Sequence, residues 1–320
     1  MSWIPTQSRG SDMSILADKP TRDEWTMTSQ ARKTQNMCKT VLGRFDDWLK
    51  LKGTTEELFF DAMRGANESQ RASTVRDIQN YWLETVKSRS AQTYRSVLIM
   101  WFEENGCPIP QSKLRRLARL PKPEVPLKYT PSKKEVAALI NTIAKQSENC
   151  FEDYKLFFTL LTCTSMRHGE LLEVRADHID LDQRSIRIPA SQTKTRRERV
   201  AFFTPQAKKI LQKYWAYQEK ARLSVHKYRR LFDLHQSSYQ YQIDQARKKL
   251  GIFKTEKDWT MHRLRAWCSQ VIKDNTNYEF GELMLGHTAG NKTYDHNVSK
   301  WKKLYDKAVP DLTLELEDKA

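Results

Sequence analysis

The chain has little cysteine, and the pattern of its cysteines excludes two common uses of that residue. Its 320 residues include five cysteines, an odd number, which are scattered and never form a CxxC pair. A disulfide framework and a zinc site both need paired or closely spaced cysteines. We therefore expect reduced thiols in a cytoplasmic protein, with no bound metal.

Several longer patterns are also missing. No apolar run approaches the length of a membrane span, and the start MSWIPTQSRGSDMSILADKP lacks the apolar core of a signal peptide. There is no GxxxxGK[ST] motif for a nucleotide and no carboxylate cluster for a pair of magnesium ions. The sequence thus predicts no membrane segment, no ATP-driven step and no cofactor.

Positive charge, in contrast, is in excess. Lys and Arg number 55 against 39 Asp and Glu, which gives a net charge of +16. This balance favours a polyanionic partner, above all nucleic acid, although charge alone does not separate DNA from RNA or from an acidic membrane. Apolar residues make up 39% of the chain, enough for packed cores, and its length suggests two domains.

The N-terminal part divides into an arm and a helical domain. Residues 1–28 are polar and irregular and are predicted to be a flexible arm. From 29 to 105, apolar residues recur at helical spacing, which predicts a domain of four or five short helices with an aromatic core. The basic residues that we expect on its outer faces, available for DNA phosphates, are Arg71, Arg76, Lys87, Arg89 and Arg95.

Residues 106–130 are predicted to be a linker because their prolines break helices and stiffen the chain. A short basic stretch within it carries Lys113, Arg115 and Arg116. It is either a solvated surface helix or a strap across the DNA backbone. The net charge and the position between two domains favour the strap.

Residues 131–320 are predicted to form a mainly helical second domain with a small β-sheet. Residues 185–188 and 199–202 alternate as strands, and the tip of their hairpin carries Lys194. Near the C-terminus, three leucines alternate with polar residues over 312–316, the period of a strand. That tail either adds to a sheet edge, its own or a neighbouring subunit's, or is a frayed end.

The chemistry-bearing residues gather between positions 260 and 297. His262 and Arg265 are three apart, so on a helix they share one face. They are followed by Leu-Gly-His, ending at His287, and by Tyr294. A basic pair, a second histidine and a phenol suit a phosphodiester attacked by tyrosine. Each signal is weak alone, since Leu-Gly-His often marks only a helix end.

An upstream half makes the pattern specific. The segment Cys-Thr-Ser-Met-Arg-His-Gly-Glu places an arginine and a glutamate three apart at the start of a predicted helix. With it, residues from about 130 to 297 resemble the tyrosine recombinases, the phage-type integrase family. The residues that match the family's pattern are, in chain order, Arg167, Glu170, Lys194, His262, Arg265, His287 and Tyr294.

The resemblance implies a helical core-binding domain followed by an α+β catalytic domain, and it assigns roles. Tyr294 is the nucleophile and Lys194 the general acid that protonates the leaving oxygen. The two arginines suit the non-bridging phosphate oxygens, and the two histidines can donate or shuttle a proton. Glu170 is expected to act without touching the phosphate, either by orienting a histidine or by closing the pocket. The hairpin residues expected to hold phosphates are Arg196, Arg197 and Arg199.

One spacing departs from the family pattern. Tyr294 follows His287 by seven residues, fewer than is usual in the family. Tyr305 and Tyr278 are the other tyrosines nearby. One lies farther along the chain and the other precedes Leu-Gly-His, so both fit the position of the nucleophile less well.

We therefore expect a site-specific DNA recombinase, an integrase, that cleaves and rejoins double-stranded DNA through a 3′-phosphotyrosyl intermediate. It would act as a homo-tetramer on paired sites, with accessory DNA-bending proteins as possible partners, on nucleoid or host-cell DNA. One alternative is a resolvase or a type IB topoisomerase of the same chemistry. Another is a non-catalytic DNA-binding relative, against which the intact Arg, Lys, His, Arg, His, Tyr series argues.

Overall fold

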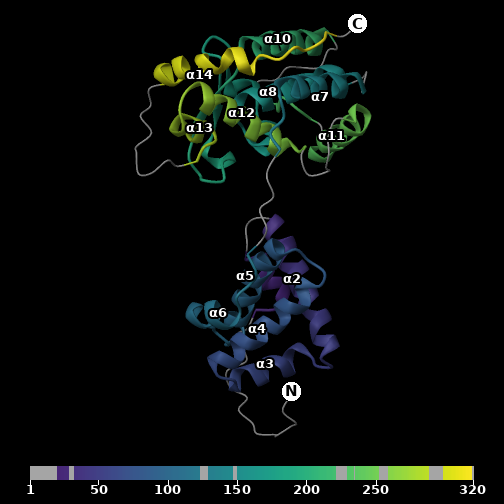
Figure 1. Ribbon diagram of the computed structural model, residues 1–320, viewed down its shortest axis with the longest axis vertical. Coiled ribbons are helices and arrows are strands. Elements are labelled where there is room, and N and C mark those ends of the chain that lie inside the picture. Colours follow the sequence, from purple (N-terminus) through teal and green to yellow (C-terminus); the bar gives the residue numbers. More distant parts are fainter. Residues whose placement is uncertain are drawn as a thin grey trace. The chain divides into compact units, whose positions relative to one another are not determined.

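In the computed structural model the chain forms two compact units, residues 1–126 and 127–320 (Figure 1). The residues that the structure describes are 20–28, 32–122, 129–146, 150–220, 229–233, 235–251, 259–287 and 298–318. No helix in this described part is both long and apolar enough to cross a membrane.

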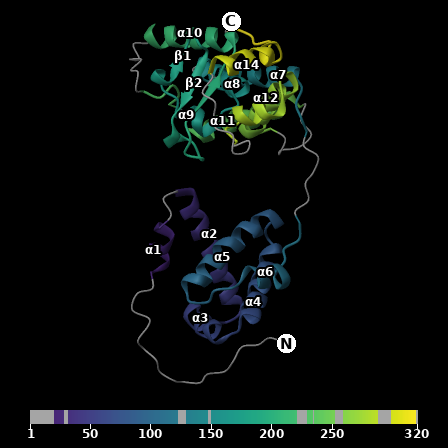
Figure 2. The ribbon, with the colours of Figure 1, turned by 90° about the vertical axis from the view of Figure 1, so that its left-hand side faces the viewer.

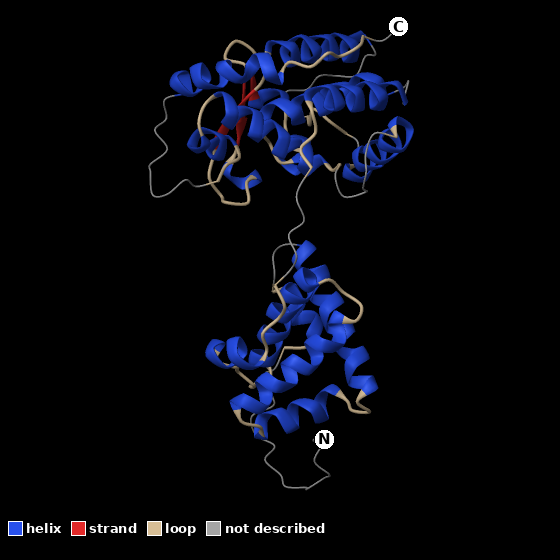
Figure 3. Cartoon of the chain, in the orientation of Figure 1, coloured by secondary structure: helices blue, strands red, loops and turns tan. Residues whose placement is uncertain are grey.

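The described part of the first unit is helical throughout (Figure 3). Its helices are α1 Arg22–Met27, α2 Arg32–Leu51, α3 Glu56–Gly65, α4 Glu68–Leu83, α5 Ser88–Glu104 and α6 Gln111–Leu117. The predicted aromatic stripes form its core. Phe45, Phe59, Phe60 and Phe102 have ring centroids between 5.1 and 6.4 Å apart. Tilted and edge-on contacts of this kind add to the free energy gained by burial.

The predicted arm is shorter than 28 residues, because α1 belongs to the first unit. Thr21 and Glu24 form a capping box that starts the helix. Arg22 then binds the carboxylates of Asp46 and Glu56 at 2.6 and 2.9 Å. The Trp25 ring lies 4.9 Å from the ring of Trp101. The prediction of a flexible arm is therefore wrong for residues 20–28, and residues 1–19 lie outside the described part.

The predicted linker also begins too early. Its first half contains α6, whose Leu114 is buried in the core of the first unit together with Cys107, Ile109 and Ala118. The helix packs against α4. The prolines at 108 and 110 precede α6 rather than separate two domains, because the apolar residues on both sides still reach the same core.

The second unit contains helices around a small sheet. Its helices are α7 Lys133–Gln146, α8 Phe151–Thr164, α9 His168–Leu172, α10 Pro205–Lys220, α11 Gln236–Leu250, α12 Met261–Asn275, α13 Tyr278–Met284 and α14 Val298–Leu312. Helix α8 is central, with every side chain from Tyr154 to Thr164 buried. It packs against α7, α10 and α12. This arrangement fixes the C-terminal end of α8, where the site begins.

The sheet confirms the predicted hairpin. Its antiparallel strands are β1 Ile179–Asp180, β2 Ser185–Ile188 and β3 Arg199–Phe202, in the order β1-β2-β3 (Figure 2). The register pairs Ser185 with Phe202 and Ile188 with Arg199. Arg199 is thus the residue at which the hairpin tip re-enters the sheet.

The C-terminal tail is neither a strand nor a frayed end. Helix α14 runs through Pro310 to Leu312, and the chain continues without regular structure to 318. Leu314 is buried, and its backbone N–H donates to the Gln206 side chain at 3.0 Å. The period-two pattern correctly indicated one buried face. The hydrogen-bond partners are side chains of α7, α8 and α10, however, and not a sheet edge.

Candidate active site

The first arginine of the family pattern sits directly after the buried helix α8. Ser165 ends that helix in the left-handed region, with φ 53°, and its hydroxyl lies 3.1 Å from the Cys268 sulfur of α12. Arg167 then caps α9. The Glu170 carboxylate accepts from both the backbone N–H and the Nη1 of Arg167, each at 2.8 Å. The spacing of three residues thus lets one carboxylate hold the arginine by its backbone and its side chain.

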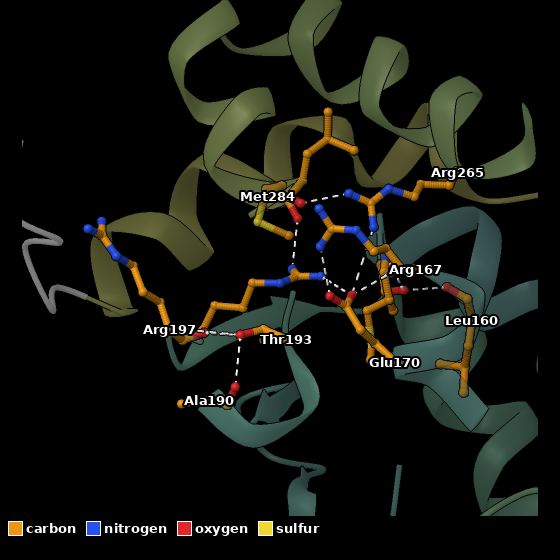
Figure 4. Close-up of polar contacts among 12 residues, drawn as sticks. Leu160, Arg167, Glu170, Ala190, Thr193, Arg197, Arg265 and Met284 are labelled. Atoms are coloured by element: carbon orange, nitrogen blue, oxygen red, sulfur yellow. Dashed lines mark hydrogen bonds and ion pairs between the residues drawn. The ribbon is translucent and has the colours of Figure 1, made fainter. Parts of the chain in front are cut away.

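Glu170 is surrounded by positive charge. Its Oε2 also accepts from Arg199 Nη2 at 2.6 Å, and Arg265 Nη1 lies 3.8 Å from the same oxygen (Figure 4). Burial alone would raise the pKa of Glu170, but the charge of Arg199 and the hydrogen bonds from Arg167 and Arg199 outweigh it and lower that pKa. Three arginines around one carboxylate leave the cluster with two uncompensated positive charges.

Arg265 is the most unusual member of this cluster. It is 2% exposed, and its Nη2 donates to the Leu285 carbonyl at 2.6 Å. Its Nε and Nη1 have no hydrogen-bond partner among the described residues. Burial, together with the charge of Arg167, lowers the pKa of Arg265 to about 10. Buried donors without acceptors are costly, about 1–3 kcal/mol each, so they point to an anion that the site receives.

The turn that carries His287 is tied to the same cluster. Helix α13 ends at Met284, Gly286 adopts φ +68°, and the His287 N–H donates to the Glu282 carbonyl at 3.0 Å. This is a glycine-terminated helix end, as the Leu-Gly-His pattern allowed. The Leu285 and Met284 carbonyls that precede the glycine accept from Arg265 and Arg199. The backbone turn that leads into His287 is therefore held by the arginines.

His287 has a carboxylate partner of its own. Its Nδ1 lies 2.7 Å from Glu282 Oε2, and the other oxygen of Glu282 accepts from Lys273 Nζ. A side chain on Gly281 would meet the stem of Lys273, since an added Cβ would overlap with its Cγ. The glycine thus lets Lys273 lie across α13 and reach Glu282.

The other members of the series occupy the surface. His262 is exposed in the first turn of α12, which Thr260 caps by accepting from the Arg263 N–H at 3.2 Å. Lys194 is exposed at the hairpin tip, next to the buried Thr193 that accepts from the Arg197 N–H at 3.0 Å (Figure 4). Tyr294 lies outside the described residues. The structure thus brings together Arg167, Glu170 and Arg265, and it ties the turn that precedes His287 to them.

The two alternative tyrosines differ in exposure. Tyr305 is fully buried, and its hydroxyl donates to the Cys163 carbonyl at 2.7 Å. Burial raises its pKa well above the usual value, which disfavours the oxyanion that a nucleophile needs. Tyr278 is exposed at the start of α13, with Lys273 Nζ 4.5 Å from the centre of its ring. Tyr305 therefore acts in packing in this structure.

Arg199 corrects one of the phosphate-binding predictions. It is 5% exposed and holds Glu170 and Met284, so it is not a surface ligand for the DNA backbone. Motif reasoning missed this role. The alternation of β3 was the available signal, because it places Arg199 on the same face as the buried Ala201.

Two more predicted phosphate ligands hold the protein backbone instead. Arg71 donates to the Met63, Arg64 and Pro108 carbonyls at 2.8, 3.0 and 3.3 Å. Arg95 donates to the Ala118 carbonyl at 3.1 Å. Lys113 is half-buried, with its Nζ 3.4 Å from the Ser69 hydroxyl. The predicted ligands that are exposed are Arg76, Lys87, Arg89, Arg115, Arg116, Arg196 and Arg197.

Comparison with known proteins agrees with this site. The sequence profile of the phage integrase family matches residues 131–300, more than half of the chain. The chain therefore belongs to the phage integrase family, the tyrosine recombinases. It is similar to tyrosine recombinase XerA of Saccharolobus solfataricus, with 34% identity over 134 residues. That match covers 42% of this chain and 41% of the relative's length.

Solved structures confirm the predicted fold class. A XerH site-specific recombinase bound to palindromic difH substrate has a TM-score of 0.59 at 16% identity, covering 85% of this chain and 75% of that one. A lambda integrase tetramer bound to a Holliday junction has a TM-score of 0.57 at 20% identity, covering 88% and 75%. At such low identity these likenesses describe the fold.

Proposed function

We propose that the chain is a site-specific DNA recombinase, an integrase that cleaves and rejoins DNA to integrate or excise a mobile element. The observation that carries this proposal is Arg265, a buried arginine whose Nε and Nη1 have no acceptor among the described residues. It lies beside Arg167 and Arg199 in a cluster with excess positive charge. A phosphodiester supplies both the oxygens and the negative charge that this cluster lacks.

The proposed reaction is a transesterification. The Tyr294 oxygen forms a bond to the scissile phosphorus while the bond from phosphorus to the 5′ oxygen breaks. The phenolic proton is lost to a base, and Lys194 donates a proton to the leaving 5′ oxygen. Arg167 and Arg265 neutralise the non-bridging oxygens, and His262 and His287 provide further hydrogen bonds or proton transfer. The 3′-phosphotyrosyl bond conserves the energy for rejoining.

Paired double-stranded DNA sites are the proposed substrate, and a homo-tetramer is the proposed working unit. Strand exchange between two duplexes requires four cleavages, one for each subunit. The similar XerH and lambda integrase structures contain recombinase bound to DNA, the latter as a tetramer on a Holliday junction. A resolvase or a type IB topoisomerase would use the same cleavage step. A non-catalytic relative would bind DNA and form no covalent adduct.

Tyr294→Phe tests the proposal, because it removes only the phenolic oxygen. The binding site would first be selected from random duplexes, then nicked so that cleavage cannot be reversed. We expect wild type to form an adduct that survives denaturing electrophoresis, and the Phe variant to bind the site without any adduct. Tyr305→Phe is the matched control and should retain the adduct. An adduct from the Tyr294 variant, or none from wild type, would contradict the proposal.

A further inference from the structure

We infer that Arg199 is a positioning residue for DNA cleavage. It occupies the Glu170 carboxylate, so that the buried Nε and Nη1 of Arg265, which have no hydrogen-bond partner among the described residues, can donate to the scissile phosphate. This inference rests on the proposed function, because it concerns the same phosphate site.

The contacts of Arg199 join three parts of the site. It comes from β3, immediately after the hairpin tip that carries Lys194. Its Nη2 donates to Glu170 Oε2 at 2.6 Å, and its Nη1 donates to the Met284 carbonyl at 2.9 Å. One buried guanidinium thus connects the Lys194 hairpin, the helix after Arg167 and the end of α13.

The stem of Arg199 also packs against the turn before His287. A Cβ added to Gly286 would lie 2.8 Å from both Cδ and Nε of Arg199. The arginine therefore fills the space that a side chain at position 286 would take. Position 286 requires a glycine for two reasons, because its φ is +68° and because a side chain would collide with Arg199. His287 follows directly, so its position depends on Arg199.

The hydrogen bonds of Glu170 show what Arg199 prevents. Oε1 accepts from Arg167 Nη1, and Oε2 accepts from the Arg167 N–H and from Arg199 Nη2. Arg265 Nη1 remains 3.8 Å from Oε2, beyond hydrogen-bond distance. Without Arg199, Oε2 would have a vacant acceptor position facing Arg265. Arg265 would then close onto Glu170, and the phosphate would have to compete with a carboxylate for the same donors.

Charge leads to the same conclusion. Three arginines and one glutamate give the cluster a net charge of two positive units. Loss of Arg199 alone would reduce this net charge to one. Loss of both Arg199 and the negative charge of Glu170 would return the net charge to two. A lysine at position 199 would keep the charge but not the planar fork that reaches Glu170 and Met284 together.

The test uses Arg199→Met and Arg199→Lys, because both retain most of the stem that packs on Gly286. Single-turnover cleavage and DNA affinity would be measured on the nicked site with the full chain. We expect Arg199→Met to slow cleavage by about tenfold or more with little change in Kd, and Arg199→Lys to lie between Met and wild type. An unchanged cleavage rate for Arg199→Met would overturn the inference.

A 5′-bridging sulfur substrate locates the defect. Sulfur leaves without a proton, so it should restore cleavage by Lys194→Ala, the matched control, and not by Arg199→Met. Rescue of Arg199→Met by sulfur would instead place its defect in leaving-group protonation and would overturn the inference.

The decisive arm is the double variant Arg199→Met with Glu170→Gln, which restores the net charge of the cluster. If Arg199 acts by occupying the carboxylate, the double variant should cleave faster than Arg199→Met alone. If Arg199 serves only packing, the reductions in cleavage rate caused by the two substitutions should multiply in the double variant. That result would contradict the inference. If Arg199→Met does not fold, the same comparison is made with Arg199→Gln, which also lacks the positive charge. Failure of wild type to form the Tyr294 adduct would refute the proposed function instead.

Discussion

Glu282 determines which ring nitrogen of His287 carries a proton. Its carboxylate oxygen lies 2.7 Å from Nδ1, and an ionised carboxylate can only accept, so that hydrogen bond assigns a proton to Nδ1. In the neutral ring, Nε2 is then the nitrogen that carries the lone pair. Lys273 fixes the other oxygen of Glu282, while the half-exposed His287 ring remains accessible. The arrangement orients an imidazole whose second nitrogen is available for proton transfer.

Glu282→Ala should therefore slow covalent adduct formation by about 10- to 100-fold, as is common when a residue that orients a functional histidine is lost. Glu282→Gln keeps an oxygen that can accept from Nδ1, so its rate of adduct formation should fall much less. Both variants would be measured by single-turnover cleavage of the nicked site. In a His287→Ala background, Glu282→Ala should cause no further loss. An equal loss there would show that Glu282 acts elsewhere.

Residue types and their order predicted the groups that we propose to contact the phosphate, but not the groups that hold them. Arg167, Arg265 and His287 belong to short patterns whose chemistry is legible in the sequence. Arg199 acts through tertiary contacts, whereas Glu282 precedes His287 by only five residues but belongs to no motif that we recognised. Arg199 meets a carboxylate 29 positions away and a carbonyl 85 positions away, so no local pattern marks its role.

At the scale of elements, helix α14 is anchored along its length to the second unit. The Tyr305 hydroxyl donates to the Cys163 carbonyl, which lies just before the Arg167 turn. Asp306 is bound by Arg184, and this ion pair holds the pKa of Asp306 below its usual value against the effect of burial. The Pro310 carbonyl accepts from Lys133 Nζ at 2.7 Å. The helix that follows Tyr294 is thus fixed to the unit that carries the arginines.

The tail after α14 continues this attachment through side-chain amides. Asn141 donates to the Glu315 carbonyl and accepts from the Glu317 N–H, both at 3.0 Å, so one side chain pairs with the tail as a strand would. Sequence periodicity could detect the buried face of the tail. It could not show that its partners would be Asn141, Gln206 and Lys155, because such pairing has no repeating pattern.

Truncation after Leu312 should lower the free energy of unfolding of the second unit by about 3 kcal/mol or more. It exposes the site of Leu314 and deprives the buried Lys155 of the Glu317 carbonyl and the Asp318 carboxylate. Denaturant titration of residues 127–320 measures the change. Lys155→Met should recover part of the loss in the truncated protein, because no buried ammonium remains. Equal stability with and without the tail would contradict this account.

At the scale of the molecule, the sequence predicted two domains but misplaced where the first one ends. Each unit buries its own core, one built on the aromatic rings of α2 to α5 and the other on α8 and its neighbours. Helix α6 fell within the predicted linker because prolines flank it and its own sequence, QSKLRRL, is rich in basic residues. The few apolar residues of α6 determine how it packs. A count of residue types does not show this, because these residues are a minority of the segment.

Both units carry more Lys and Arg than Asp and Glu, so both should contribute to the dependence of DNA binding on salt. Each phosphate neutralised adds about 0.9 to the slope of log K against log salt concentration. Residues 127–320 alone should therefore bind more weakly and with a shallower slope than the full chain. Binding would be measured by fluorescence anisotropy over a series of salt concentrations.

The structure also identifies which residues of the first unit should carry that difference. Arg76, Lys87 and Arg89 are exposed, and replacing all three with Gln in the full chain should reduce the slope by about 2 to 3. Arg71 is the matched control, since its donors already bind three backbone carbonyls. Arg71→Gln should lower the stability of the first unit and leave the slope unchanged. If the triple variant keeps the full slope while Arg71→Gln loses part of it, the first unit contacts DNA through a different face.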